Sequence, residues 1–309
     1  MSTKHSRPLI GLALGSGSAR GWAHIGVLKA LKEMDIEPDI VCGTSIGSLV
    51  GGLYVSGQLD KLHNWILGLD RREIIKYLDI SLLTGGGFVE GKNLMTFFQK
   101  HMGDFEIESL DKSFASVATN LASGREVWIQ KGSILEAMRA SMALPGLFTP
   151  VLKEDEWLVD GGIVNPVPVS VCKALGAEKV IAVNLNGDIV GKHLNNNIKP
   201  TKDSFSTLTE ETLLEKFSEN LMGKASKLFP DLFNQKINNP GLFDVLASSI
   251  NIMQDRITRS RMAGDPPDIL LSPKIAQIGL MEFDRAEEAI SAGENVVKQF
   301  EPYLKELIH

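Results

Sequence analysis

Short apolar runs and amphipathic stretches alternate along the first 60 residues. The runs "PLIGLAL" (8–14) and "DIVCG" (39–43) are short and continuous, which is typical of buried strands. Apolar residues recur at helical spacing over 22–34, and "IGSLVGGLYVSG", which begins at Ile46, predicts a second helix. A strand–helix–strand–helix order predicts a parallel sheet with helices on its faces.

The pattern over residues 59–110 is helical but irregular, and clearer signals return after it. These signals predict, in order, a hairpin (114–130), a helix stopped by Pro145 (133–144), a strand (156–159), a helix (168–175) and a strand (179–185). The chain is therefore expected to be an α/β protein with a mostly parallel central sheet and helices on both faces.

The composition changes near residue 187. Residues 187–240 are polar and rich in Asn, Ser, Thr and Lys, and a structureless loop of this length is uncommon in a compact domain. Two amphipathic patches lie inside this segment: Leu213, Leu214, Phe217 and Leu221, then Leu228, Phe229, Leu232 and Phe233. We interpret 187–240 as an insertion whose patches are a candidate lid.

A regular pattern of apolar and polar residues resumes after the insertion. The pattern predicts a helix over about 242–262, a strand over 268–273 and a final helix over about 284–307. The expected organisation is a core (8–186), the insertion (187–240) and the C-terminal part of the same domain (241–309).

Composition and charge limit the binding partners and the cellular location that we expect for the protein. A net charge of −6 gives no reason to expect a nucleic-acid partner, and an anionic membrane surface would not attract the whole molecule. Cys42 and Cys172 have apolar neighbours, so they are expected to be buried free thiols in a reducing compartment. No apolar segment reaches 18 residues. The expected location is the cytoplasm, with peripheral contact to the inner face of the membrane left open.

The stretch "GTSIG" (43–47) has the pattern G-x-S-x-G between a predicted strand and a predicted helix. This is the arrangement of a nucleophile elbow, in which Gly43 and Gly47 leave room for neighbouring backbone. The helix that follows would favour negative charge at Ser45. The alternative is that Thr44 or Ser45 only caps the helix.

The glycine-rich stretch "GSGSARG" (15–21) joins the first strand to the first helix. A dinucleotide site would need a third glycine where Arg20 stands, and a carboxylate at the end of the second strand. We favour an oxyanion hole, in which amides around Gly17 and Ser18 point at a carbonyl held over Ser45.

A carboxylate stands at the end of a third strand, in "DGGIVNPVP" (160–168). Asp160 could take the proton of Ser45, and the alternative is an ordinary turn or helix-cap Asp. A serine nucleophile usually has a histidine base. Among the six histidines, the late ones, His193 and His309, follow no strand, so a two-residue Ser–Asp site fits better.

These three stretches together resemble the patatin-like phospholipase family, in particular its bacterial RssA-type branch. "GWAHIGVLKAL" (21–31), "ASMALPGLF" (140–148) and "NPVPVS" (165–170) are also similar to that family. The resemblance covers about 8–186 and resumes at 259–273. It implies a three-layer patatin-like fold.

The resemblance also implies roles for particular residues. Ser45 would be the nucleophile and Asp160 the base of a catalytic dyad. The oxyanion loop would comprise Gly15, Ser16, Gly17, Ser18, Arg20 and Gly21, and the motif after the base would be Gly161 and Gly162. The family's loop is usually all glycine, so Ser16 and Ser18 predict a strained or differently shaped loop. Arg20 would orient the loop or meet a lipid phosphate, or form a structural salt bridge.

The function expected from these residues is hydrolysis of lipid or fatty-acyl esters by a serine esterase of the phospholipase A or lysophospholipase kind. Such a reaction needs no metal or organic cofactor. Two alternatives remain: a regulatory protein that keeps the fold and binds a partner, and a nucleotide-dependent oxidoreductase. The sequence leaves the head group, the chain length and the oligomeric state open.

Overall fold

The computed structural model describes residues 7–69, 73–74, 77, 91–187 and 242–307. The chain divides into two compact units, one of residues Met1–Val190 with Ile250–His309 and the other of residues Gly191–Ser249. The central sheet and the candidate site belong to the first unit. Both amphipathic patches of the predicted insertion, and with them the candidate lid, lie outside the described residues.

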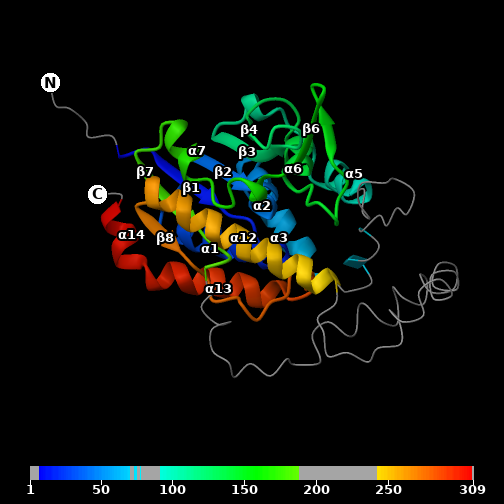
Figure 1. Cartoon of the computed structure of the whole chain (residues 1–309). Coiled ribbons are helices and arrows are strands. Elements are labelled where there is room, and N and C mark those ends of the chain that lie inside the picture. The colour runs from blue at the N-terminus through cyan, green and yellow to red at the C-terminus, as the bar shows by residue number, and fades with distance from the viewer. Residues whose placement is uncertain (1–6, 70–72, 75–76, 78–90, 188–241, 308–309) are drawn as a thin grey trace, which may run out of the picture. The chain divides into compact units, whose positions relative to one another are not determined.

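An eight-stranded sheet forms the centre of the first unit (Figure 1). The strands are β1 (Ile10–Leu14), β2 (Ile40–Thr44), β3 (Ser113–Asn120), β4 (Glu126–Ile129), β5 (Val151–Lys153), β6 (Glu156–Asp160), β7 (Lys179–Val183) and β8 (Ile269–Leu271). Their order is β5-β6-β3-β2-β1-β7-β8, with β4 paired to β3. β1, β2, β3, β7 and β8 run parallel, whereas β4, β5 and β6 form antiparallel pairs.

Helices cover both faces of this sheet. They are α1 (Ala23–Glu33), α2 (Ile46–Val55), α3 (Leu59–Leu67), α5 (Lys92–His101), α6 (Ile134–Ser141), α7 (Val169–Ala174), α12 (Leu242–Gly264), α13 (Ala286–Gln299) and α14 (Glu301–Leu307). Three short 3-10 helices also occur among the described residues: η1 (Ser18–Trp22), η2 (Ile107–Ser109) and η3 (Gly161–Ile163). In Figure 1, α7 lies on one side of the sheet, and α1 and α13 lie on the other. The predicted mixed α/β fold with a mostly parallel sheet is confirmed.

Side chains of the central strands alternate between two buried clusters, as a strand's period of two requires. In β1, Ile10, Leu12 and Leu14 join the cluster shared with α1, α2 and α13, whereas Ala13 faces the cluster that includes α7. All five residues of this strand are buried, which explains why its sequence is a continuous apolar run rather than an alternating one.

The structure differs from the predicted elements in two places. The final helix, predicted as continuous over about 284–307, is two helices that break at Phe300. Pro302 has no N–H to donate to the carbonyl of Lys298, and its ring would collide with that carbonyl in a continuous helix. β5, which was not predicted, has only three residues and so gives almost no pattern.

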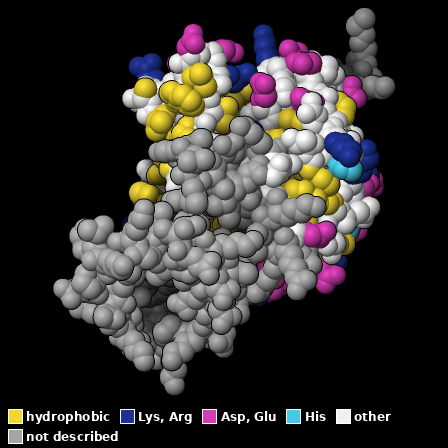
Figure 2. All heavy atoms as spheres, turned by 90° about the vertical axis from the view of Figure 1, so that its right-hand side faces the viewer, with side chains coloured by type: hydrophobic (Ala, Val, Ile, Leu, Met, Phe, Trp, Pro, Cys, Tyr) yellow, Lys and Arg dark blue, Asp and Glu magenta, His cyan; other side chains and the backbone are white. Residues whose placement is uncertain are grey.

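Charge on the visible surface is mixed. On the described part of the face drawn in Figure 2, acidic and basic side chains are interspersed with small groups of hydrophobic ones. An extended basic area is not seen on that part. Among the described helices, none is both long enough and apolar enough to cross a bilayer.

Candidate active site

Two of the predicted functional stretches lie at the carboxyl ends of neighbouring parallel strands, and the third follows β6, which pairs antiparallel with β3. β1 pairs with β2 and with β7, so the segments after all three strands lie at the same edge of the sheet. This edge is where α/β proteins place their ligands. The loop of residues 15–21 follows β1, and Ser45 follows β2 directly.

Ser45 lies in a sharp turn between β2 and α2. Its φ of 57° and ψ of −124° place a residue other than glycine in a sparsely populated region of backbone space. Its N–H donates a hydrogen bond to Oγ of Ser141 at 2.8 Å, which helps to hold the turn. Neighbouring backbone crowds the turn, since a Cβ at Gly47 would collide with the carbonyl of Leu14 and one at Gly43 with the carbonyl of Gly47.

The hydroxyl of Ser45 points away from the helix it precedes. Its O–H donates to Oδ2 of Asp160 at 2.6 Å, and α2 has no side-chain cap. The hydroxyl of Thr44 instead donates to the carbonyl of Asn165. The helix-cap alternative is therefore wrong for both residues. α2 also directs the positive end of its dipole towards Ser45, which favours negative charge there.

Asp160 reaches Ser45 because of the register of β3. Thr44 pairs with Val117, and Asp160 pairs with the next residue of β3, Ala118. The main chain of Asp160 is fixed on both sides, since its N–H donates to Ala143 and its carbonyl accepts from Oγ1 of Thr119. The carboxyl group is thus held at the turn.

The carboxyl group of Asp160 is almost completely buried, with 1% of the residue exposed. Burial disfavours the charged form and raises the pKa to about 6, although hydrogen bonds from Ser45 and from the N–H of Gly162 oppose the rise. The bond from Gly162 caps η3, the turn that Gly161 and Gly162 begin. Asp160 therefore caps η3, as the alternative interpretation expected, and it also accepts the hydrogen bond from Ser45.

Most amides of the loop 15–21 are used inside the protein. The N–H of Gly15 donates to Val183, that of Ser16 to Pro166, and that of Ala19 to Leu280. The amides of Gly17 and Ser18 have no acceptor among the described residues, and both residues line the pocket that contains Ser45. Within the described part of the chain, these two N–H groups therefore remain without an acceptor in the loop beside Ser45. The last loop residue, Gly21, packs closely against Ile46 at the start of α2.

The predicted strain of this loop falls on Ser18. Ser18 has a φ of 52°, in the region that favours glycine, whereas Gly17 has an extended φ of 168°. Such a conformation costs about 1 kcal/mol or more for a residue with a side chain. The hydroxyl of Ser18 donates to the carbonyl of Leu280 at 2.6 Å, so its side chain anchors the strained residue.

Arg20 contacts the loop through its main chain and its side chain. Its side chain is buried, and both its N–H and its Nε donate to the carbonyl of Gly17. In a trans peptide the carbonyl and the next N–H point in opposite directions, so this contact turns the N–H of Ser18 away from Arg20. Burial lowers the pKa of the guanidinium to about 10, and no carboxylate of the described residues pairs with it. The salt-bridge alternative thus finds no support in the described part of the chain.

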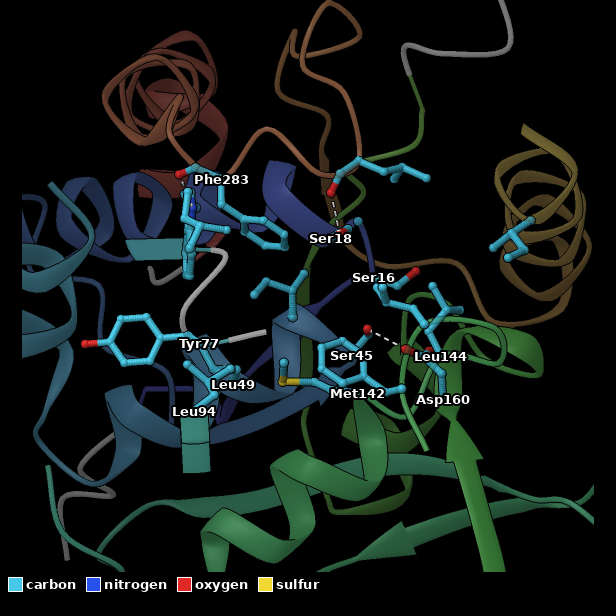
Figure 3. A pocket seen from close by; sticks show the side chains of 18 of the residues that line it. Ser16, Ser18, Ser45, Leu49, Tyr77, Leu94, Met142, Leu144, Asp160 and Phe283 are labelled. Carbon is cyan, nitrogen blue, oxygen red and sulfur yellow. Dashed lines mark hydrogen bonds between the residues drawn. The ribbon is translucent and has the colours of Figure 1, made fainter. Parts of the chain in front are cut away.

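Ser45 and Asp160 stand at the polar end of a pocket whose lining is mostly apolar (Figure 3). Ser16 and Ser18 lie on one side of Ser45, and Tyr77, Leu49 and Leu94 lie further along the pocket. The empty space, including solvent at the mouth, is about 950 Å³. Aromatic and aliphatic side chains line the far part: Leu49, Trp65, Leu69, Tyr77, Leu94 and Phe98. This shape suits a ligand with one reactive polar group and an apolar chain.

The described histidines, His24, His63 and His101, make no hydrogen bond to Ser45 or Asp160. His24 is fully buried, and its Nε2 lies 2.8 Å from the carbonyl of Gly15. Burial lowers its pKa to about 4, so the ring is neutral at ordinary pH and Nε2 is the donor in this contact. His24 therefore supports the loop and has no contact with the serine.

Sequence reasoning missed three polar residues of the site. Ser141 binds the N–H of Ser45, Asn251 accepts from Arg20, and Gln254 accepts from Ser16. Ser141 lies in "ASMALPGLF", a stretch similar to the family but without a recognised role. Asn251 and Gln254 are spaced by three residues in "NIMQ", a spacing that places them on one helix face but does not say what they face.

Comparison with known proteins places the chain in a family. The family model of patatin-like phospholipases matches residues 12–173, just over half of the chain. An uncharacterized NTE family protein of Mycobacterium tuberculosis is 31% identical, over 95% of this chain and 91% of its own length. The solved structure of VipD from Legionella pneumophila is a more distant likeness, with 13% identity and a TM-score of 0.45 over 96% of this chain and 66% of its own.

Two fungal proteins named as lysophospholipases are also similar to this chain. The nte1 protein of Emericella nidulans and that of Aspergillus fumigatus are each 30% identical over 96% of this chain, which corresponds to 18% of either fungal protein. The match to the family model and these relatives lead to one conclusion: the chain belongs to the patatin-like phospholipase family.

Proposed function

We propose that the protein is a serine acyl hydrolase that cleaves fatty-acyl esters of lipids. The observation that carries the proposal is the 2.6 Å hydrogen bond from Oγ of Ser45 to Oδ2 of Asp160, at the polar end of an apolar pocket. Hydrolases that use a nucleophile need such a bond, because the serine must lose its proton as it attacks.

The chemistry follows from the positions of these groups. Oγ of Ser45 attacks the ester carbonyl while its proton passes to Oδ2 of Asp160. The negative oxygen that forms accepts hydrogen bonds from the amides of Gly17 and Ser18. Asp160 then gives the proton to the departing alcohol, and an acyl-enzyme remains.

Water completes the cycle by the reverse sequence. A water molecule loses a proton to Asp160 as its oxygen attacks the acyl carbon, and the carbonyl oxygen again occupies the oxyanion hole. The carbon–Oγ bond breaks, Ser45 recovers its proton from Asp160, and a fatty acid leaves. No metal or organic cofactor takes part in these steps.

The raised pKa of Asp160 supports its proposed role as the base. A carboxylate is ordinarily weak as a base, because its pKa lies near 4. Burial that raises the pKa to about 6 brings it closer to neutral pH, where proton transfer is more effective while the carboxylate still remains ionised. The dipole of α2 and the amides of Gly17 and Ser18 stabilise the negative charge that develops during the attack.

The proposed substrate class rests on the pocket and on the relatives. The apolar far part offers a place for an acyl chain, and fungal relatives are named as lysophospholipases. We therefore expect a lipid ester as substrate, bound with its ester group at Ser45 and its acyl chain towards Leu94 and Tyr77.

A short p-nitrophenyl ester tests the proposal. The wild-type protein should release nitrophenol, and Ser45→Ala should lower kcat by at least about 10³-fold, as the loss of a nucleophile does. Retained folding of the variant, followed by circular dichroism, is the control. Turnover that persists in Ser45→Ala would contradict the proposal, and a wild-type protein without turnover would favour the regulatory alternative.

A further inference from the structure

Two amide side chains of α12 contact the loop 15–21 near both of its ends. Oδ1 of Asn251 accepts a hydrogen bond from Nη2 of Arg20 at 2.9 Å, and Oε1 of Gln254 accepts one from the O–H of Ser16 at 3.0 Å. The two amides are three residues apart, so they share one face of the helix. Both also line the pocket that contains Ser45.

A second donor fixes the orientation of the Gln254 amide. Nδ2 of Asn186, a residue that follows β7, donates to the same Oε1 at 3.1 Å. In this orientation Oε1 accepts from both donors and Nε2 lies on the other side of the amide. A methyl group on Gly162 would lie 2.5 Å from this Nε2 and 2.9 Å from Oδ1 of Asp160. Gln254 thus lies against both the loop 15–21 and the turn that follows Asp160.

The contact with Gln254 depends on a hydroxyl that glycine lacks. Ser16 is 2% exposed, its N–H donates to Pro166, and its O–H donates to Gln254. Gly17 follows directly, so the position of Ser16 sets where the unpaired amide of Gly17 lies. The serine that interrupts the glycine-rich pattern therefore supplies one more anchor for the loop than a glycine would.

We propose that Gln254 and Asn251 are positioning residues for the oxyanion hole: α12 holds the loop through Ser16 and Arg20, so that the amides of Gly17 and Ser18 stay aimed at the reacting carbonyl. Donors that are already in place need no rearrangement in the transition state, which is why their alignment affects the rate of the chemical step. The inference rests on the proposed function, since an oxyanion hole matters only if Ser45 attacks an ester.

A double-mutant cycle tests the contact between Ser16 and Gln254. Ser16→Ala removes one hydroxyl, and Gln254→Met keeps the size of the side chain but removes the acceptor. Each variant should lower kcat per fluorophosphonate-titrated site about five- to tenfold and leave KM within about threefold, as expected for one lost hydrogen bond that acts in the transition state. The double variant should be no slower than the slower single one, because both changes break the same contact.

The control is Met253→Ala, on the exposed side of the same helix, which should keep the wild-type kcat. A purely structural role would lower thermal stability and leave kcat per titrated site unchanged, and that result would overturn the inference. Single effects that multiply in the double variant would overturn it as well.

A second variant covers the case in which Gln254→Met does not fold. Asn251→Ala removes the acceptor for Arg20 and should lower kcat per titrated site about five- to tenfold while KM stays within about threefold. Full kcat in folded Asn251→Ala would contradict the anchoring role of Asn251. Ser16→Ala at full rate in a protein with Ser45-dependent turnover overturns this inference alone, whereas a wild type without such turnover overturns the proposed function too.

Discussion

Asp160 combines two properties that usually exclude each other, a charge and complete burial. It is 1% exposed, and the described residues within hydrogen-bond distance of its carboxyl group are neutral donors, the hydroxyl of Ser45 and the N–H of Gly162. A carboxylate in this situation is costly when ionised, so its pKa rises to about 6. Burial therefore makes the carboxylate of Asp160 a stronger base, but it also makes the ionised carboxylate unfavourable for the folded state at neutral pH.

The pKa of Asp160 should set the acid limb of the proposed activity. The proposed reaction needs ionised Asp160, so kcat/KM should fall about tenfold per pH unit below about pH 6 and level off above it. The measurement is kcat/KM for a short neutral ester from about pH 4 to 8, with folding checked at each pH. An acid limb near pH 4 would mean that burial does not raise the pKa of Asp160. A limb that persists in Asp160→Asn would assign it to another residue.

At the scale of elements, the pocket is built by α2, α3 and α5 on one side of Ser45. Leu49 lies one turn after Ser45 on α2, Trp65 is on α3, and Leu94 and Phe98 are on α5. Trp65 packs edge-on against Phe98, with ring centroids 5.4 Å apart. This contact holds both aromatic rings in place in the lining of the apolar part of the pocket. These helices would therefore decide how long an acyl chain fits.

Leu94→Trp tests whether acyl chains occupy this part of the pocket. Leu94 is half-buried and lines it, so a larger side chain should lower kcat/KM for a dodecanoyl ester at least about tenfold more than for an acetyl ester. Met95→Trp is the matched control, because Met95 is half-buried on the same helix but does not line the pocket. An equal effect of Leu94→Trp on both esters would place the acyl chain elsewhere.

At the scale of the whole molecule, the sheet and most of the site could be predicted because their signals are local. A buried strand such as β1 is a run of apolar residues, and the elbow around Ser45 requires glycines at fixed spacing. Contacts between distant segments leave no such signal. Gln254 reaches Ser16 across 238 positions, and the hydroxyl of Ser18 reaches the carbonyl of Leu280 across 262 positions. Neither contact could have been found from one sequence.

Stability of the molecule should reflect the burial of Asp160. A carboxyl group with a raised pKa favours the folded state when protonated and loses that advantage as the pH rises through about 6. Asp160→Asn keeps a neutral side chain at every pH, so it should stabilise the protein at about pH 8 by on the order of 2–3 kcal/mol, at about 1.4 kcal/mol per pKa unit. The gain should shrink towards zero near pH 4. Urea unfolding at both pH values measures it, and a gain that does not change with pH would contradict the assigned cause.

Labelling with a fluorophosphonate probe shows whether Ser45 is a reactive nucleophile, because the probe reacts only with an activated serine and mass spectrometry identifies the modified residue. We expect the wild-type protein to be labelled at Ser45 and Ser45→Ala to remain unlabelled. Asp160→Asn should lose most of the labelling while folded, and His24→Ala, checked for folding, should keep it. Loss of labelling in folded His24→Ala, together with full labelling of Asp160→Asn, would contradict the Ser45–Asp160 dyad.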